Sequence, residues 1–239
     1  MDQWGVRQSN KIQHSIKILW SQFWFQVESS PKKPCKKGFT GSRGFKKNFG
    51  QICKNLYEEN KEGYKEIDLY FQDESRFGLF TKDGRMLTAK GVKPICTSHQ
   101  EYSSTWLFGA FSPITGDHLL MELPVCNTEC FQLFLDELSS EKPKTLIVMV
   151  LDNGSFHKAK KLKIPDNIKL VFLPPYSPEL NPAEKMWARL KRAFTNKLFK
   201  SMEEISLFID NAVNQINNTT VISTCAYKYI FFDPFWNEI

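Results

Sequence analysis

The chain has 239 residues, 41% of them hydrophobic and 14% aromatic, and this composition excludes an intrinsically disordered protein. Its formal net charge is +6 and its pI is near 8.9, which favours an anionic partner such as a nucleic acid. Six cysteines without a C-x-x-C pair exclude the common structural zinc sites, and no run of about 18 apolar residues is present, so no membrane partner is expected.

Residues 1–62 are predicted to form a short helical and basic N-terminal extension. Apolar residues recur at helical spacing over 11–25, and such a short helix needs other helices to bury its face, so residues 1–30 are interpreted as the remnant of a DNA-binding region. Residues 31–62 are predicted to be a basic linker followed by a helix over 45–62. A solvated tether and an arm that tracks the DNA backbone explain the linker cations equally well. These cations are Lys32, Lys33, Lys36, Lys37 and Arg43. The N-terminus lacks the basic-then-apolar layout of a secretory signal, which indicates a cytosolic protein of bacterial type or a nuclear protein.

A period of two begins at Ile67 and predicts a strand over 67–74. Asp73 lies on the same predicted face as Ile67, Leu69 and Phe71, whereas the adjacent Glu74 lies on the opposite face. Asp73 therefore extends an apolar face and is expected at the edge of a core. Further strands are predicted over 85–90, 104–112 and 117–123, with a hairpin turn at 113–116, as an antiparallel set.

The second half of the chain predicts helices alternating with buried strands. A helix is expected over 128–138, strands over 145–152 and 168–173, a helix over 202–217, and a C-terminal tail over 221–239. The run over 145–151 is continuously apolar, as in a central strand covered on both faces, and Asp152 ends it. In open α/β sheets, sites form outside the carboxyl ends of strands.

A proline-rich segment, Leu173-Pro-Pro-Tyr-Ser-Pro-Glu-Leu-Asn-Pro-Ala-Glu-Lys-Met-Trp187, is predicted to deliver Glu184 on a rigid loop. Asn181 suits a helix cap, Pro182 suits the first helical position, and Glu184 then falls at the third. The same spacing resembles a capping box, which would give Glu184 a purely structural role. The following helix carries the apolar stripe Trp187, Leu190, Phe194 and Leu198.

Three acids thus occupy special positions, and each alone has a structural explanation. Asp73 could cap a turn, Asp152 could form an Asx-turn, and Glu184 could belong to a capping box. Taken together, three carboxylates near one core would repel each other unless a cation gathered them. Hard oxygen ligands suit Mg²⁺ or Mn²⁺, and a pair of such ions supports phosphoryl transfer. Basic residues next to the acids are either a solvated face or a phosphate-contacting rim: Lys158, Lys185, Arg189 and Arg192. His157 and Glu74 are left outside the proposed triad.

The blocks Gln72-Asp-Glu-Ser-Arg-Phe-Gly78, Leu151-Asp-Asn-Gly-Ser-Phe-His157 and Leu173–Trp187 occur in this order. Together they resemble the retroviral-integrase-like catalytic domain of DDE-type transposases of the mariner-related bacterial insertion-sequence superfamily. The resemblance implies an α/β, ribonuclease H-like domain over residues 63–220, with a mixed sheet flanked by helices. It also implies that Asp73, Asp152 and Glu184 are catalytic and hold two Mg²⁺ ions, for which Mn²⁺ can substitute.

The activity implied by this resemblance is cleavage of DNA strands at transposon ends and strand transfer into target DNA. The implied partners are double-stranded DNA, both terminal inverted repeats and target, and a second copy of the chain in a homodimer on DNA. The implied location is the cytoplasm, in association with the nucleoid. Two alternatives stay open: a catalytically idle or truncated transposase remnant that only binds DNA, and another ribonuclease H-like nuclease.

Overall fold

A computed structural model of the chain describes residues 39–80, 90, 101–231 and 234–237. The helix predicted over 11–25 and the linker cations Lys32, Lys33, Lys36 and Lys37 lie outside these residues. So does the strand predicted over 85–90, except for its last position.

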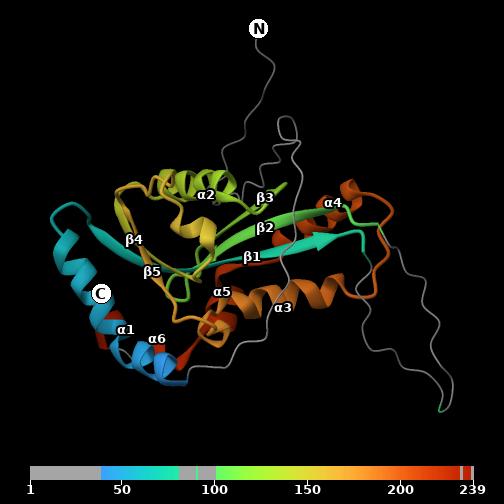
Figure 1. Ribbon diagram of the computed structural model, residues 1–239. Helices are drawn as coiled ribbons and strands as arrows, with labels where there is room; N and C mark the ends of the chain where they lie inside the picture. The colour runs from blue at the N-terminus through green and yellow to red at the C-terminus, as the bar shows by residue number, and fades with distance from the viewer. Residues whose placement is uncertain (1–38, 81–89, 91–100, 232–233, 238–239) are drawn as a thin grey trace, which may run out of the picture.

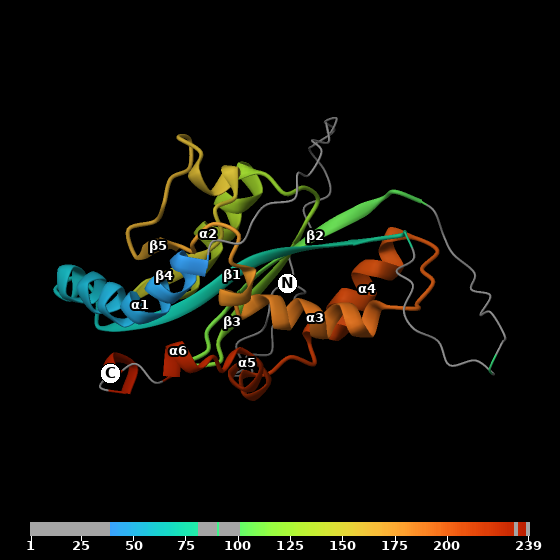
Figure 2. The ribbon, with the colours of Figure 1, turned by 60° about the horizontal axis from the view of Figure 1, so that its bottom comes forward.

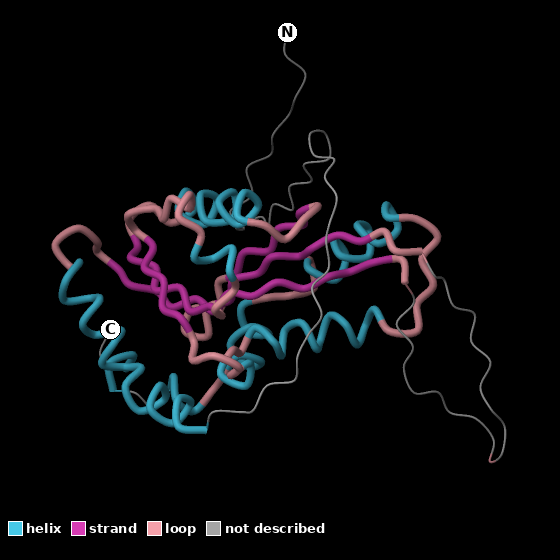
Figure 3. Tube along the Cα trace, in the orientation of Figure 1, coloured by secondary structure: helices cyan, strands magenta, loops and turns pink. Residues whose placement is uncertain are grey.

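A five-stranded mixed sheet forms the centre of the fold, in the order β3-β2-β1-β4-β5 (Figure 1, Figure 3). The strands are β1 (Glu66–Gly78), β2 (Ser104–Phe111), β3 (His118–Leu123), β4 (Thr145–Leu151) and β5 (Ile168–Phe172). β1 pairs antiparallel with β2 and parallel with β4. Every residue of β4 is buried, as its continuously apolar sequence predicts.

Helices cover both faces of this sheet. The α-helices are α1 (Phe39–Asn60), α2 (Thr128–Glu141), α3 (Ala183–Phe194), α4 (Met202–Val213), α5 (Asn218–Cys225) and α6 (Lys228–Phe231). The 3₁₀ helices are η1 (Ser155–Lys158), η2 (Pro178–Leu180) and η3 (Pro234–Asn237). α2 packs on one face, where Phe134 contacts Phe108 of β2, and the other α-helices lie along the opposite face (Figure 1, Figure 2). None of the described helices is long and apolar enough to cross a membrane.

The faces of β1 follow the predicted alternation. Leu69 and Phe71 belong to the core under α1 and α6, whereas Tyr70 belongs to the core under α2. Asp73 accordingly points to the helical layer that contains α3, where it meets Trp187. Glu74 points to the opposite layer, where it meets His157.

α1 begins earlier than residue 45, so the prediction that Arg43 lies in a linker was wrong: it lies on a helix. Gly41 and Gly44 both weaken a helix locally, which is why the segment resembled a linker. Tertiary packing offsets this weakness, because Phe49 is fully buried with its ring centroid 6.1 Å from that of Phe71.

α3 ends earlier than the predicted apolar stripe. The stripe included Leu198, but the helix stops at Phe194 and the chain turns at Asn196, whose φ is 62°. Leu198 is consequently 47% exposed and Phe199 is buried in its place. The periodic pattern was correct as far as the helix continues.

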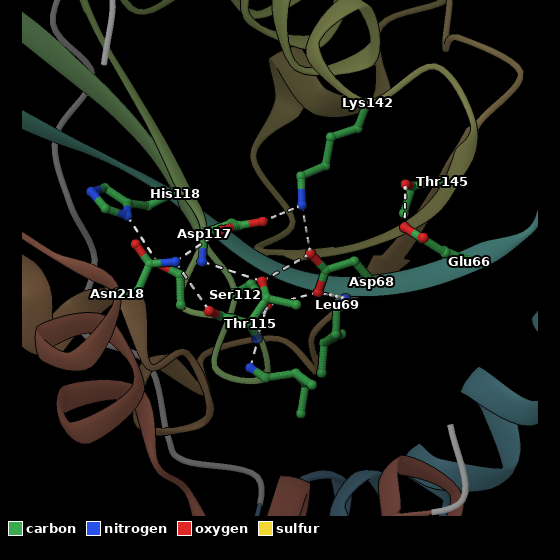
Figure 4. A network of polar contacts seen from close by, with 12 residues as sticks. Glu66, Asp68, Leu69, Ser112, Thr115, Asp117, His118, Lys142, Thr145 and Asn218 are labelled. Atoms are coloured by element: carbon green, nitrogen blue, oxygen red, sulfur yellow. Dashed lines mark hydrogen bonds and ion pairs between the residues drawn. The ribbon is translucent and has the colours of Figure 1, made fainter. Parts of the chain in front are cut away.

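A buried carboxylate, Asp68, anchors the hairpin turn and the end of α2 to β1 (Figure 4). Asp68 is 3% exposed; its Oδ1 accepts hydrogen bonds from the backbone N–H of Leu69 at 2.8 Å and from Ser112 Oγ at 2.7 Å. Its Oδ2 accepts from Lys142 Nζ at 3.1 Å and from Thr115 Oγ1 at 3.1 Å. The network therefore supplies both hydrogen bonds and a compensating charge to a buried acid.

Replacing Lys142 with Met should lower the free energy of unfolding by about 2 kcal/mol, because Asp68 loses its charge partner but keeps its other hydrogen bonds. Lys142 also pairs with Asp117. Burial acts to raise the pKa of Asp117, but the hydrogen bond and charge of Lys142, with hydrogen bonds from Asn218 and Thr115, outweigh burial and hold that pKa below the usual 3.8. A carboxyl group with a lowered pKa stabilises the fold above its unfolded pKa, and this contribution is lost as pH falls through the folded pKa.

The difference between wild type and Lys142→Met in urea unfolding should therefore be constant near neutral pH and shrink in acid, below about pH 4. Lys144→Met is the matched control, since Lys144 is exposed and its substitution should change stability by less than about 0.5 kcal/mol. Equal stability of the two variants would show that the charge pair contributes nothing.

Candidate active site

The loop between β5 and α3 is tied to β1 by Asn181. The Asn181 side chain is buried, donates from Nδ2 to the carbonyl oxygen of Gln72 at 2.9 Å, and accepts from the N–H of Ala183 at 3.1 Å. Pro182 has helical angles and occupies the cap position, so α3 begins one residue later than predicted and Glu184 is its second residue. Asn181 thus fixes the start of the helix next to Asp73, and that start fixes the position of Glu184.

Asp73, Asp152 and Glu184 line one cavity of about 390 Å³. Asp73 comes from the middle of β1, Asp152 directly follows β4, and Glu184 stands in the first turn of α3. The structure therefore brings together the three acids that the sequence singled out. In the conformation observed for the described residues, no three His, Cys, Asp or Glu side chains converge into a ready metal cluster.

Asp73 is held by an indole N–H and faces a glycine on the neighbouring strand. Trp187 Nε1 donates to Asp73 Oδ2 at 3.0 Å, and Gly109 lies directly opposite Asp73 in the β1–β2 register. A Cβ at Gly109 would lie 2.7 Å from Cη2 of Trp187, so the indole occupies space that only glycine leaves open. Burial, followed by the charges of Glu74 and Glu184, raises the pKa of Asp73 to about 8.

His157 lies between Asp152 and Glu74 and is 2% exposed. Its Nε2 is 3.1 Å from Glu74 Oε1, within hydrogen-bonding distance. Its Nδ1 is 3.0 Å from Asp152 Oδ1, which is close enough for an ion pair but lacks the geometry of a hydrogen bond. Burial acts to lower the pKa of His157, but the two carboxylates outweigh it and raise the pKa to about 9. His157 in turn lowers the pKa of Asp152, which also accepts from the N–H of Gly154 at 2.8 Å. This last contact is the Asx-turn expected as a structural alternative, and it coexists with the position of Asp152 in the cavity.

Two of the predicted DNA-contacting lysines lie beside the cavity. Lys158 donates to Asn153, a residue of the cavity wall, and lies 4.6 Å from the ring centroid of Phe172. Lys185 directly follows Glu184 and lies 4.1 Å from the ring centroid of Tyr227. Their positions suit contacts with phosphates that flank the cavity.

The other predicted DNA-contacting residues in the described part of the chain, Arg43, Arg189 and Arg192, do not line this cavity. Arg189 and Arg192 line a separate hollow between α3 and the end of α4, together with Ala212 and Ile216. Arg43 is exposed on α1. The structure therefore does not gather all predicted DNA-contacting residues at one place.

Three residues of the site escaped the sequence interpretation. Trp187 was assigned only to the buried stripe of α3, although a buried indole N–H requires an acceptor and this requirement was an available signal. His157 and Glu74 were left outside the site. They lie 83 positions apart in sequence, and no local pattern indicates that they meet.

The mixed sheet, with acids at β1, the end of β4 and the start of α3, defines a ribonuclease H-like fold. The sequence profile described as DDE superfamily endonuclease matches residues 68–206, more than half of the chain, and the chain belongs to this family. This confirms the resemblance inferred from the three sequence blocks.

Similar proteins include an uncharacterized protein of Sinorhizobium fredii, y4pE/y4sA. It is 41% identical over 102 residues, which cover 42% of this chain and 76% of that protein. The structure is similar to the Mos1 transposase paired-end complex with left transposon end, with a TM-score of 0.57, 15% identity, and coverage of 89% of this chain and 65% of the other. The catalytic domain of Mos1 mariner transposase matches with a TM-score of 0.51 and 15% identity, over 86% of this chain and 95% of that domain. The chain thus spans slightly less than two thirds of the longer Mos1 chain.

Proposed function

We propose that this chain carries the catalytic domain of a transposase that cuts DNA strands at transposon ends and transfers them into target DNA. The observation that carries the proposal is the shared cavity of Asp73, Asp152 and Glu184 in a member of an endonuclease family. Carboxylate oxygens are the ligands that Mg²⁺ and Mn²⁺ prefer, and mutual repulsion of these acids would be relieved by a divalent cation. Crystal structures of the Mos1 paired-end complex have been solved with Mg and with Mn.

The three acids, Trp187 and His157 each have a role under this proposal. Asp73, Asp152 and Glu184 would hold two Mg²⁺ ions, with Mn²⁺ as a substitute. When bound, these ions would activate the attacking oxygen and stabilise the leaving oxygen of the phosphodiester. Trp187 orients the carboxylate of Asp73, and His157 restrains that of Asp152.

The proposed partners are double-stranded DNA at terminal inverted repeats and at the target, and a second copy of the chain. Lys158 and Lys185 would contact phosphates on either side of the cavity. Recognition of the repeats, dimerisation on DNA and association with the nucleoid belong to the proposal as well. Mos1 transposase itself has been solved as a paired-end complex with its left transposon end and as a strand transfer complex.

The purified full chain should nick plasmid DNA that contains the inverted repeats flanking its reading frame, in the presence of Mg²⁺ or Mn²⁺ and not of EDTA. Random duplex and an RNA–DNA hybrid serve as comparison substrates. Preferential nicking at the repeats supports the transposase. Preference for the hybrid would favour another ribonuclease H-like nuclease, and salt-sensitive binding without any cleavage would favour a DNA-binding remnant.

A further inference from the structure

An exposed aromatic side chain stands at the open edge of the carboxylate cavity. Tyr176 lines the same cavity as Asp73, Asp152 and Glu184, yet 66% of its surface is exposed. Its ring is therefore accessible from solvent beside the three acids. The proposed chemistry assigns no task to it.

The backbone of Tyr176 is in the left-handed region, with φ at 57°. This conformation is unfavourable for a residue with a bulky side chain, and glycine or asparagine adopts it at lower cost. Because the residue is mostly exposed, burial in the core offsets only a small part of that cost. Strained residues of this kind concentrate at binding and catalytic sites, where the surrounding structure holds them.

The surroundings of Tyr176 do hold it. The next residue, Ser177, is buried; its Oγ lies 3.0 Å from Ser42 Oγ of α1 and donates to the carbonyl oxygen of Pro175 at 3.3 Å. A Cβ at Gly41 of α1 would lie 3.3 Å from Cβ of Pro174, so α1 also packs closely on the loop. The loop that carries Tyr176 is therefore held against α1 by residues on either side of Tyr176 in the sequence.

We propose that Tyr176 is a stacking surface for an unpaired nucleobase of the DNA strand whose phosphate enters the carboxylate cavity, an inference that rests on the proposed function. A nucleotide combines the two chemistries that this edge offers: a phosphate for the metal-binding acids and a flat π face for the phenol ring. Bases inside a duplex are covered by their neighbours, so the base that stacks on Tyr176 must be unpaired. Stacking of this type tolerates any base sequence.

The test uses the full chain with Asp152→Asn, so that the proposed cleavage is blocked, and a short DNA duplex with a single-stranded 3′ extension that carries 2-aminopurine. The unsubstituted Tyr176 protein and Tyr176→Phe should quench the 2-aminopurine fluorescence and bind equally well. Tyr176→Asn, which suits the left-handed backbone but lacks a ring, should not quench and should bind about tenfold more weakly. On the same duplex with an abasic extension, all three proteins should bind alike.

Tyr102→Asn is the matched control. Tyr102 is also aromatic and is 78% exposed. It precedes β2, and the first residue of β2 lies roughly 17 Å from Asp73 along the paired strands β1 and β2. Its substitution should therefore change neither the 2-aminopurine quenching nor the DNA affinity. Three results would each overturn the proposal. Tyr176→Asn could still quench the fluorescence, or Tyr176→Phe could lose as much DNA affinity as Tyr176→Asn. The third is weaker binding of Tyr176→Asn on the abasic extension as well. These readouts need no cleavage, so failure of the nuclease assay with quenching intact would refute the transposase function alone.

Discussion

Substitution of Asp152 with Asn should abolish metal-dependent nicking, with a loss of roughly 10³-fold or more, because metal ions supply several kcal/mol of transition-state stabilisation. Asp73→Asn and Glu184→Gln should have the same effect, since the three acids line one cavity and would act as one unit. The nicking rate on plasmid DNA measures the loss. Calorimetric titration with Mn²⁺ should show that each variant binds the ion more weakly.

The control for these substitutions is Glu179→Gln. Glu179 is an exposed acid in the same proline-rich segment and accepts a hydrogen bond from Ser42 Oγ at 3.3 Å, but it does not line the carboxylate cavity. Its substitution should leave nicking and Mn²⁺ binding unchanged. Retained nicking in all three cavity variants would refute the catalytic assignment.

Stability gives an independent check on the same residues. The pKa of Asp73 is raised by burial and by Glu74 and Glu184, which means that its charged form is unfavourable in the folded protein. Asn at position 73 cannot ionise, so Asp73→Asn avoids this cost to stability and keeps an oxygen that can accept from Trp187. The variant should therefore unfold at the same or a higher temperature than wild type while losing activity, a combination typical of a functional residue.

The positions of the three acids could be predicted because each follows from a local rule. The alternation of β1 placed Asp73 on the correct face, the apolar run of β4 placed Asp152 at a strand end, and the proline-rich segment placed Glu184 at a helix start. Their meeting at one cavity then follows from the mixed sheet, in which β1 and β4 are adjacent and parallel.

The contacts that hold the acids could not be predicted in this way. His157 reaches Glu74 because η1 folds over the face of β1 that carries the even-numbered residues, and no periodicity encodes the path of that loop. The start of α1 was missed because two glycines and a serine locally disfavour a helix that packing on the sheet stabilises. Local rules therefore located the reactive groups, and tertiary packing determined how they are oriented.

Gly109 offers the sharpest test of this orientation. Gly109→Ala should lower the free energy of unfolding by about 1–3 kcal/mol, because the new Cβ would lie 2.7 Å from the Trp187 ring and 2.9 Å from the Phe111 ring. Displacement of the indole would also break its hydrogen bond to Asp73. Loss of a group that orients a metal ligand typically costs about 10- to 100-fold in activity, and the nicking rate should fall by that amount.

Two further variants separate packing from orientation. Trp187→Phe keeps a ring in the core but removes the N–H donor, so it should lose nicking activity to the same extent as Gly109→Ala. Its loss of stability, measured by urea unfolding, should be smaller than that of Gly109→Ala. Gly44→Ala, at an α1 position where a Cβ would contact nothing within 4 Å, should instead raise stability by about 0.5–1 kcal/mol and leave nicking unchanged. Wild-type nicking by Gly109→Ala, together with reduced stability, would mean that Trp187 only fills space. Equal losses of activity in Gly109→Ala and Trp187→Phe would instead show that Gly109 helps to orient Asp73, because it leaves room for the indole that binds the Asp73 carboxylate.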